Sequence, residues 1–536
     1  MREQRFVIRA ARVVDGTGAP WFVGDVEVAG DRIARVGRCL DVPRGTREIR
    51  ADGRVVAPGF IDIHSHSDDT ILLNPRAESK VRQGVTCEVV GNCGYSLAPL
   101  EGEALADVRR DLGEAGLDLS WRSFGEYLRA IEKCGTAVNV ASLVGHGTIR
   151  RAVMGCVDRA PSREEMERMK SLLSGALAEG AWGLSTGLIY PPSCYASMDE
   201  LVELAQVSAS AGGMYASHIR YEEDRVVEAV EEAIAIGERA RVPVQVSHHK
   251  AGGVQNWGKV RMTIELMSKA RARGVDVACD VYPYTASSTG LAVILPQWIF
   301  DGGLEAAMAR LKDTAVREGI RRQVEEEEGA KRGWDKTVIA SCTRDRNKRF
   351  EGKNLVEIAE MTGKDPFTAA LDLIVDESAA VQTVRFGMCE EDVEYVLAWP
   401  ASSIGSDASV RAPYGPLGKG KPHPRSYGTF PRVLARYVRE RGVLTLEEAV
   451  RKMTSLPAQR LGILDRGIIR PGMVADLVVF DPDKVADTAT YDDPHRYPTG
   501  IDWVFVAGTP VIERGEHTGA TPGRVLRHRH EHGHAA

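Results

Sequence analysis

The feature that most restricts the fold of this chain is a regular alternation of short apolar stretches with longer amphipathic ones. Each apolar stretch has the length and composition of a buried β-strand, and the stretches between them carry apolar residues at spacings of three and four, as helices do. Eight strands separated by helices predict an α/β fold of the (β/α)8 barrel type. The predicted strands cover residues 55–64, 85–90, 138–144, 182–186, 214–218, 244–248, 275–282 and 402–407.

The two ends of the chain have a different pattern. Residues 1–57 and 465–516 contain short alternating strands separated by turns, as in FVIRAARVVDG at one end and WVFVAGTPVIERG at the other. Each segment is too small to fold alone. We therefore expect the two to pair into one small β-sandwich domain beside a barrel of residues 58–464.

Two further segments do not belong to the alternating pattern. Residues 290–400 are too long for one connection between a strand and a helix, and they contain helical patterns, so we expect an insertion or lid subdomain between strands seven and eight. Residues 517–536 end in RHRHEHGHAA. We expect a disordered His-rich tail that binds metal only adventitiously.

Composition excludes several classes of protein. Lys and Arg total 69 against 75 Asp and Glu, a formal charge of −6 without a basic block, so nucleic acid is not an indicated partner. No apolar run approaches the roughly 18 residues that cross a bilayer, and the N-terminus lacks the features of a signal peptide. Nine scattered cysteines argue against a disulfide framework. Reduced thiols predict a cytoplasmic protein.

Metal-competent side chains stand at the carboxyl ends of several predicted strands. His64 and His66 end the first strand in GFIDIHSHSDD, and residues two apart on a strand point to the same side, which suits chelation of one ion. These strand ends converge on one mouth in a (β/α)8 barrel, so the pattern predicts a metal site built from several strands. The other candidates are Cys93, His146, His218, His248 and Asp407.

Some of these positions have a second interpretation. On residue type alone, Cys93 is better interpreted as a small buried residue in a tight turn between Gly91 and Gly94. His146 either lines the pocket or supports a loop. His249, directly after His248, points to the other side of its strand and is expected to be structural.

Several motifs resemble those of one known family. They are APGFIDIHSHSD, VVGNCGYS, SHIRYE, QVSHHKAGG, DVYPYTASST, IGSDAS, KPHPRSYGTFPRVL and GIIRPGMVADLVVFDP, and they extend over nearly the whole chain. The sequence resembles the N-acyl-D-amino acid deacylases, or D-aminoacylases, of the amidohydrolase superfamily. The GNCG setting of Cys93 and the HPRSYGTFPRVL string carry the specific part of this resemblance.

The resemblance implies a zinc centre. A cysteine takes the place of the carboxylated lysine that many two-metal relatives use as the bridging ligand, and Cys93 matches that position. One tightly bound zinc is expected on Cys93, His218 and His248, with a position left for water. A second, weaker divalent site is expected on His64, His66 and Asp407.

The resemblance also implies the substrate, a small N-acyl-D-amino acid whose amide is hydrolysed to a carboxylate and a free D-amino acid. Asp407 is the expected proton acceptor and donor. Lys250, Tyr282, Ser288 and Arg425 are the expected partners of the substrate α-carboxylate. Nothing in the spacing or composition of the residues distinguishes D from L substrates.

Two alternatives remain open from the sequence. A cyclic amidase such as a hydantoinase, dihydropyrimidinase or dihydroorotase shares the barrel and the terminal domain, and a non-catalytic homologue would keep the barrel but lose ligands. One segment departs from the family pattern: residues 408–420, ASVRAPYGPLGKG, are longer and richer in Gly and Pro, and could reshape the side-chain pocket. Acyl preference, side-chain preference and oligomeric state are not predicted.

Overall fold

A ring of parallel strands forms the centre of the computed structural model, which describes residues 5–327 and 333–528. Hydrogen-bonded neighbours run β6-β7-β8 and β9-β10-β11-β12-β13-β17. Trp182 N, just before β10, donates to Ser142 O of β8 at 3.0 Å and joins the two runs, while Asp407 N donates to His64 O at 2.8 Å and closes the ring. The predicted (β/α)8 barrel is confirmed. Its strands are β6 (Phe60–Asp62), β7 (Val85–Val90), β8 (Asn139–Ser142) continued by β9 (Val144–Gly145), β10 (Gly183–Gly187), β11 (Met214–His218), β12 (Val244–Val246), β13 (Val277–Val281) and β17 (Ser402–Ile404).

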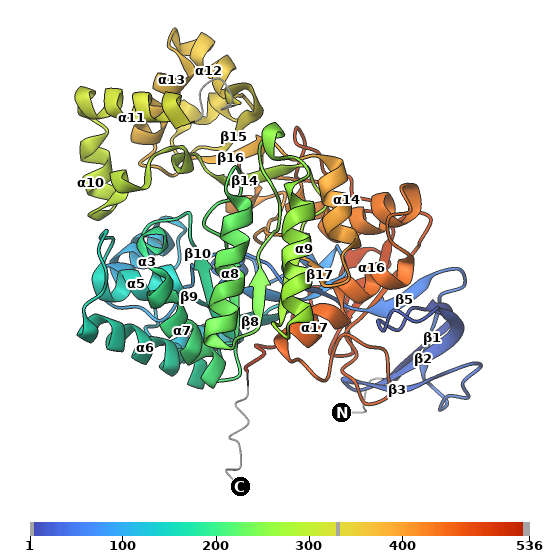
Figure 1. The fold of residues 1–536 in the computed structure, drawn as a ribbon. Coiled ribbons are helices and arrows are strands. Elements are labelled where there is room, and N and C mark those ends of the chain that lie inside the picture. The colour runs from blue at the N-terminus through green and yellow to red at the C-terminus, as the bar shows by residue number, and fades with distance from the viewer. Residues whose placement is uncertain (1–4, 328–332, 529–536) are drawn as a thin grey trace.

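Helices surround the ring because the strands are apolar on both faces and need cover outside as well as inside. Figure 1 shows α8 and α9 lying against the strands on the near side. Within the described residues, no helix has both the length and the apolar character needed to cross a membrane. The surrounding helices include α4 (Phe124–Cys134), α5 (His146–Met154), α6 (Arg163–Ala178), α7 (Met198–Ser210), α8 (Val226–Ala240), α9 (Lys259–Ala272), α14 (Glu390–Ala398), α16 (Leu446–Met453) and α17 (Ser455–Leu461).

The strand predicted over residues 55–64 is in fact two strands. β5 (Val55–Pro58) pairs with strands from the chain ends, whereas β6 pairs with β7 of the barrel. Gly59 lies at the transition, where a Cβ atom would come within 2.3 Å of the Thr86 side chain. The prediction of one strand was wrong because both halves are equally apolar, so hydrophobicity does not reveal the change of sheet.

Strands from the two chain ends form one nine-stranded sheet. The N-terminal strands are β1 (Arg5–Val13), β2 (Phe22–Ala29), β3 (Arg32–Gly37) and β4 (Arg47–Arg50), and β5 joins them to β18 (Leu477–Phe480), β19 (Ile501–Val506), β20 (Thr509–Glu513) and β21 (Glu516–His517). Phe6 of β1 stacks on Phe505 of β19 with ring centroids 4.5 Å apart, although β5 and β18 lie between these strands. The sheet therefore curls over its own apolar core.

A separate subdomain interrupts the barrel between β13 and β17 and appears in yellow and orange at the top of Figure 1. It has its own apolar core and an antiparallel sheet ordered β14-β16-β15. The expected bounds 290–400 need correction at both ends, because β14 begins at Ala286 and α14 packs on barrel helix α9. The elements are β14 (Ala286–Gly290), α10 (Gly303–Arg310), α11 (Thr314–Glu327), β15 (Thr337–Ser341), α12 (Leu355–Thr362), α13 (Pro366–Asp376) and β16 (Gln382–Phe386).

Residues 517–528 follow a defined path across the end of the barrel opposite the strand carboxyl ends. Leu526 N donates to Val140 O at 2.7 Å, and His528 N donates to Gly180 O at 3.0 Å. The Leu526 side chain packs against the apolar cluster inside the barrel. The expected disordered tail was therefore wrong for these residues, and positions 529–536 lie outside the described part of the chain.

Candidate metal centre

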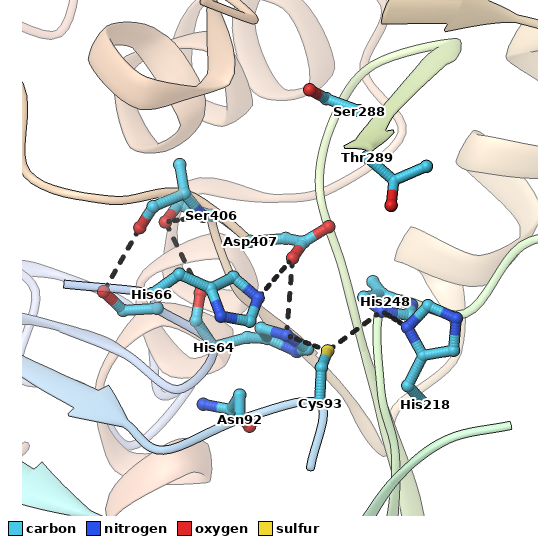
Figure 2. Close-up of polar contacts among 12 residues, drawn as sticks. His64, His66, Asn92, Cys93, His218, His248, Ser288, Thr289, Ser406 and Asp407 are labelled. Atoms are coloured by element: carbon cyan, nitrogen blue, oxygen red, sulfur yellow. Dashed lines mark hydrogen bonds and ion pairs between the residues drawn. The ribbon is translucent and has the colours of Figure 1, made fainter. Parts of the chain in front are cut away.

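Six side chains that the sequence predicts as metal ligands meet at the carboxyl ends of the barrel strands (Figure 2). They fall into two groups whose donor atoms lie within 4.8 Å of one another, and Cys93 belongs to both groups. We call the six the ligand cluster. The first group is His64, His66, Cys93 and Asp407, and the second is Cys93, His218 and His248.

The Cys93 sulfur lies between the two groups. Its Sγ is 3.3 Å from His64 Nε2 and 3.4 Å from His248 Nε2. Burial would raise the pKa of this thiol, but the charges of the neighbouring histidines, His64 and His248 first, hold it well below its usual value. A thiolate shared by two sets of imidazoles suits a bridging metal ligand.

The remaining donor atoms are equally close. His218 Nδ1 and His248 Nε2 are 2.8 Å apart, and Asp407 Oδ1 lies 2.9 Å from His66 Nε2 and 3.4 Å from His64 Nε2. Buried, convergent sulfur and imidazole donors with one carboxylate match the ligands that zinc prefers. The residues present therefore fit the zinc centre that the sequence predicts.

Three residues of the ligand cluster have left-handed backbone conformations. The φ angles are +51° at Cys93, +33° at His248 and +50° at Asp407. Such values are uncommon outside glycine and cluster at functional sites, where the surrounding structure holds them. At His248 this turn directs the side chain into the mouth, whereas His249 Nε2 lies 2.7 Å from Thr263 Oγ1 on α9. The expectation that His249 faces away from the cluster agrees with this contact.

Two carboxylates that the sequence analysis missed orient the histidines. Asp280 Oδ1 lies 3.0 Å from His64 Nδ1 and accepts the backbone N–H of His248 at 2.8 Å. Glu222 Oε1 lies 3.1 Å from His248 Nδ1. A carboxylate on the outer ring nitrogen leaves the other nitrogen free to bind metal, which is the usual arrangement in zinc sites. Asp280 and Glu222 also lie at or just beyond the ends of strands. Acidic residues are common in this chain, however, and nothing in the spacing of these two indicated a role at the metal centre.

Three of the predicted substrate-binding residues form one group, which we call the carboxylate cluster: Lys250, Tyr282 and Arg425. The Tyr282 ring lies between the two cations, 5.7 Å from Lys250 Nζ and 4.7 Å from the Arg425 guanidinium carbon. Both cations already have acidic neighbours, since Lys250 Nζ bonds Glu222 Oε1 at 2.5 Å and Arg425 Nη1 lies 2.7 Å from Asp407 Oδ2.

The fourth predicted residue, Ser288, is placed differently. Its backbone oxygen accepts a hydrogen bond from Arg425 Nη2 at 3.2 Å. Figure 2 shows its hydroxyl directed away from the ligand cluster, whereas the hydroxyl of the next residue, Thr289, points toward the cluster. Thr289 Oγ1 also lies 3.0 Å from the Tyr190 hydroxyl. The Tyr190 ring lies 5.0 Å from the His218 ring, so Thr289 and Tyr190, which the sequence analysis did not single out, both lie beside the ligand cluster.

His146, whose role the sequence left open, supports a loop. Its Nδ1 lies 2.9 Å from Ser193 Oγ and its Nε2 lies 3.0 Å from Glu200 Oε1, and the residue is fully buried. It belongs to neither group of metal-competent donors.

The ligand cluster and the carboxylate cluster open into one groove of about 1900 Å³. The insertion contributes Ser288 and Trp298 to its lining, and the segment after Asp407 contributes Arg411 and Lys419. The groove is larger than the usual 300–1,000 Å³ of small-molecule sites. The groove therefore extends well beyond the ligand cluster, as far as Lys336 near the insertion strand β15.

Comparisons with known proteins agree with this geometry. The amidohydrolase family model matches residues 47–512. The D-aminoacylase of Alcaligenes xylosoxydans xylosoxydans is 39% identical to this chain over 97% of both sequences. The crystal structure of the N-acyl-D-glutamate deacylase of Bordetella bronchiseptica, complexed with zinc and a phosphonate inhibitor, has a TM-score of 0.82 at 37% identity, and the match covers 98% of this chain and 100% of that one.

A more distant structure shares the fold alone. The D-hydantoinase of Thermus sp. has a TM-score of 0.55 at 14% identity, and the match covers 98% of this chain and 99% of that one. The identity of 37–39% over almost the full length of the deacylases, together with the cysteine in the ligand cluster, identifies the subgroup of the family as well as the family. The chain belongs to the amidohydrolase family, and within that family to the N-acyl-D-amino acid deacylases.

Proposed function

We propose that this protein is a zinc-dependent deacylase that hydrolyses the amide bond of N-acyl-D-amino acids and releases a carboxylate and a free D-amino acid. The observation that carries the proposal is the position of the carboxylate cluster at the same mouth as the Cys93-centred ligand cluster. Asp407 links the two, since its Oδ1 faces His66 at 2.9 Å and its Oδ2 faces Arg425 at 2.7 Å.

Zinc, when bound to these residues, would polarise the scissile carbonyl and bring the pKa of a water molecule near neutrality. The protein's own residues would supply orientation and proton transfer. Asp407 is placed to accept a proton from the attacking water and return it to the leaving nitrogen, because one carboxylate oxygen faces the ligand cluster and the other faces the substrate cations.

The α-carboxylate of the substrate would be held by the carboxylate cluster. Arg425 Nη1 is close to Asp407 but has no hydrogen bond, so a substrate carboxylate can take a better-aligned position on the same guanidinium. Lys250 adds a second positive charge and Tyr282 a hydroxyl. D stereospecificity enters this proposal from the deacylases that the chain resembles.

A cytoplasmic location is part of the same proposal. All nine cysteines are unpaired in the structure. Reduced thiols are the rule in the cytosol.

The test is hydrolysis of paired N-acetyl-D- and N-acetyl-L-amino acids by the zinc-loaded protein and by Cys93→Ala. We expect cleavage of the D forms alone, and loss of both turnover and bound zinc in Cys93→Ala. His249→Gln serves as the matched control, because this neighbouring buried histidine contacts Thr263 and not the ligand cluster. Hydantoin or dihydropyrimidine cleavage without any cleavage of N-acetyl-D-amino acids would establish the cyclic amidase instead, and absence of bound metal would favour a non-catalytic homologue.

A further inference from the structure

One mostly buried cation in the groove has no hydrogen-bond or ion-pair partner among the described residues. Arg411 lies four residues beyond Asp407 and lines the groove. Its guanidinium forms no hydrogen bond or ion pair with any residue of 5–327 or 333–528, and its Nε is completely buried without a partner. By contrast, the cations Lys250 and Arg425 each face a carboxylate.

The backbone at Arg411 is held firmly. Arg411 N donates to Ser79 Oγ at 2.8 Å, and Val410 N donates to Ser67 Oγ at 2.9 Å. The Tyr414 hydroxyl bonds Glu78, so the loop is tied at several points to the short helix α2 (Glu78–Val81). The guanidinium is therefore presented from a fixed base, which reduces the entropy lost when it binds a ligand.

An unpaired, mostly buried guanidinium is costly, because it has lost water without gaining a counter-ion. Burial lowers the pKa of Arg411, and the nearby Tyr427 and Asp69 only partly compensate. A planar guanidinium binds a carboxylate through two parallel hydrogen bonds, which a lysine cannot do. A carboxylate in the groove would supply the missing partner.

The position of Arg411 separates it from the carboxylate cluster. The charged or titratable neighbours of Arg411 are Asp69, Tyr427 and His495, whereas Lys250 and Arg425 flank Tyr282. Four residues of chain span at most about 14 Å, so Arg411 is within reach of a substrate whose amide lies beside Asp407. A substrate already bound through its α-carboxylate could therefore place a second carboxylate on Arg411.

We propose that Arg411 binds a second carboxylate of the substrate, carried either by the amino acid side chain, as in D-glutamate or D-aspartate, or by a dicarboxylic acyl group such as succinyl. This inference rests on the proposed deacylase function. The relatives do not decide it, because a D-aminoacylase and an N-acyl-D-glutamate deacylase match the chain almost equally well.

The experiment compares charged substrates with uncharged isosteres. We would measure kcat/KM for N-acetyl-D-glutamate against N-acetyl-D-glutamine, and for N-succinyl-D-leucine against N-butyryl-D-leucine, with wild type, Arg411→Met and Arg411→Lys. We expect one of the two ratios to favour the dicarboxylate in wild type and to fall about 10- to 100-fold in Arg411→Met, with a smaller fall in Arg411→Lys. The ratio that responds identifies which part of the substrate carries the second carboxylate.

Arg273→Met is the matched control, because this exposed arginine follows α9 and does not line the groove. It should leave both ratios as in wild type. The inference is overturned if wild type has no preference for either dicarboxylate, or if Arg411→Met slows charged and uncharged substrates by the same factor.

A binding measurement separates failure of this inference from failure of the proposed function. Succinate, D-glutamate and butyrate would be titrated by calorimetry into wild type and Arg411→Met, whose melting temperatures are compared first. Weaker binding of succinate or D-glutamate to the variant supports the site even if no N-acyl-D-amino acid, N-acetyl-D-leucine included, is hydrolysed. Equal binding by the two proteins overturns it.

Discussion

At the scale of single residues, the ligand cluster depends on carboxylates that face the outer side of the histidines. Asp280 accepts from His64, from the backbone of His248 and from Gln245 Nε2, the last at 3.0 Å. We expect Asp280→Asn to lower zinc affinity about 10- to 100-fold, since the amide lacks the charge that raises imidazole basicity. Competition with a chelator of known affinity measures the change.

The same variant should remain folded. The Gln245 amide oxygen is buried without a partner, so a flip of this amide would satisfy the amino group that the substitution introduces at position 280. Asp280→Ala, which leaves three buried donors unpaired, is the destabilised comparison. Unchanged zinc affinity in Asp280→Asn would mean that this carboxylate does not tune the cluster.

Strand-end positions explain why the ligands, but not their supports, could be predicted from sequence. Histidine and cysteine are rare enough that six of them near strand ends stand out beside Asp407. The structure brings five of these six together with Asp407 and leaves only His146 outside the ligand cluster. Asp280 and Glu222 are acids among 75 in the chain, so their roles depend on hydrogen bonds that only the folded structure displays. At Ser288 the direction of the hydroxyl could not be predicted, because in β14 the hydroxyl of the next residue, Thr289, points toward the ligand cluster instead.

At the scale of secondary-structure elements, a buried lysine joins the first and last strands of the barrel. Lys80 Nζ of α2 bonds Asp62 Oδ2 of β6 at 2.8 Å, and beyond β17 it bonds Ser406 Oγ at 2.8 Å and Ala408 O at 2.7 Å. Glu88 of β7 lies 3.5 Å from the same ammonium. The residues just beyond these contacts include His64 and Asp407, so the lysine holds together the backbone that carries both.

We expect Lys80→Met to destabilise the protein by about 3–5 kcal/mol, because Asp62 and Glu88 are fully buried and would lose their shared counter-ion. The free energy of urea unfolding measures this. The double variant Lys80→Met with Asp62→Asn should be less destabilised than Lys80→Met alone, since only one buried carboxylate, that of Glu88, is then left without a counter-ion. A single variant as stable as wild type would contradict the role of the lysine.

Helix α6 gives a pH-dependent prediction. Glu165 closes a capping box with Ser162 and pairs with Arg159 through contacts of 2.6 and 2.7 Å. The hydrogen bonds from Arg159 lower the pKa of Glu165 to about 2. A carboxyl with a depressed pKa in the folded state stabilises above its unfolded pKa, and that contribution disappears as the pH falls through the folded value.

Glu165→Gln should therefore cost about 0.5–1 kcal/mol at pH 7. The difference from wild type should shrink as the pH falls from about 4.5 toward 2. Thermal unfolding at several pH values measures both. A difference that stays constant down to pH 2 would show that the charge of Glu165 does not contribute.

Most barrel elements follow from sequence because hydrophobic period and helix caps act locally. The errors in predicting the bounds of these elements come from strand pairing between segments that are distant in the sequence. The change of sheet at Gly59 depends on whether β18 or β7 is the neighbour, and the start of the insertion at β14 depends on pairing with β16 about a hundred residues later. Neither partner can be identified from the local pattern.

At the scale of the whole molecule, the C-terminal end of the chain completes the separate sheet and then also covers one end of the barrel. The polypeptide leaves β21 and crosses the closed end of the barrel, where Gly523 N donates to Thr136 O at 2.7 Å and Trp182 Nε1 donates to Leu526 O at 2.6 Å. The His-rich, low-complexity ending suggested disorder from about residue 517. Leu526, however, is an apolar residue that packs against the buried apolar cluster inside the barrel. Composition averaged over the tail concealed this one contact.

Truncation tests the contribution of this segment. Removal of residues 517–536 should destabilise the protein by about 2–4 kcal/mol, because it exposes the apolar surface under Leu526 and leaves the backbone groups of Val140 and Gly180 without their partners. Leu526→Ala in the full chain should reproduce about 2 kcal/mol or more of this loss if the side chain is the main contact. Truncation after His528 keeps every one of these contacts and is the control for chain length. The zinc content of that shorter protein also tests the expectation that the terminal histidines bind metal only adventitiously, since zinc held by the ligand cluster should remain after the His-rich end is gone. A full truncation as stable as the control would show that the segment lies on the barrel without supporting it.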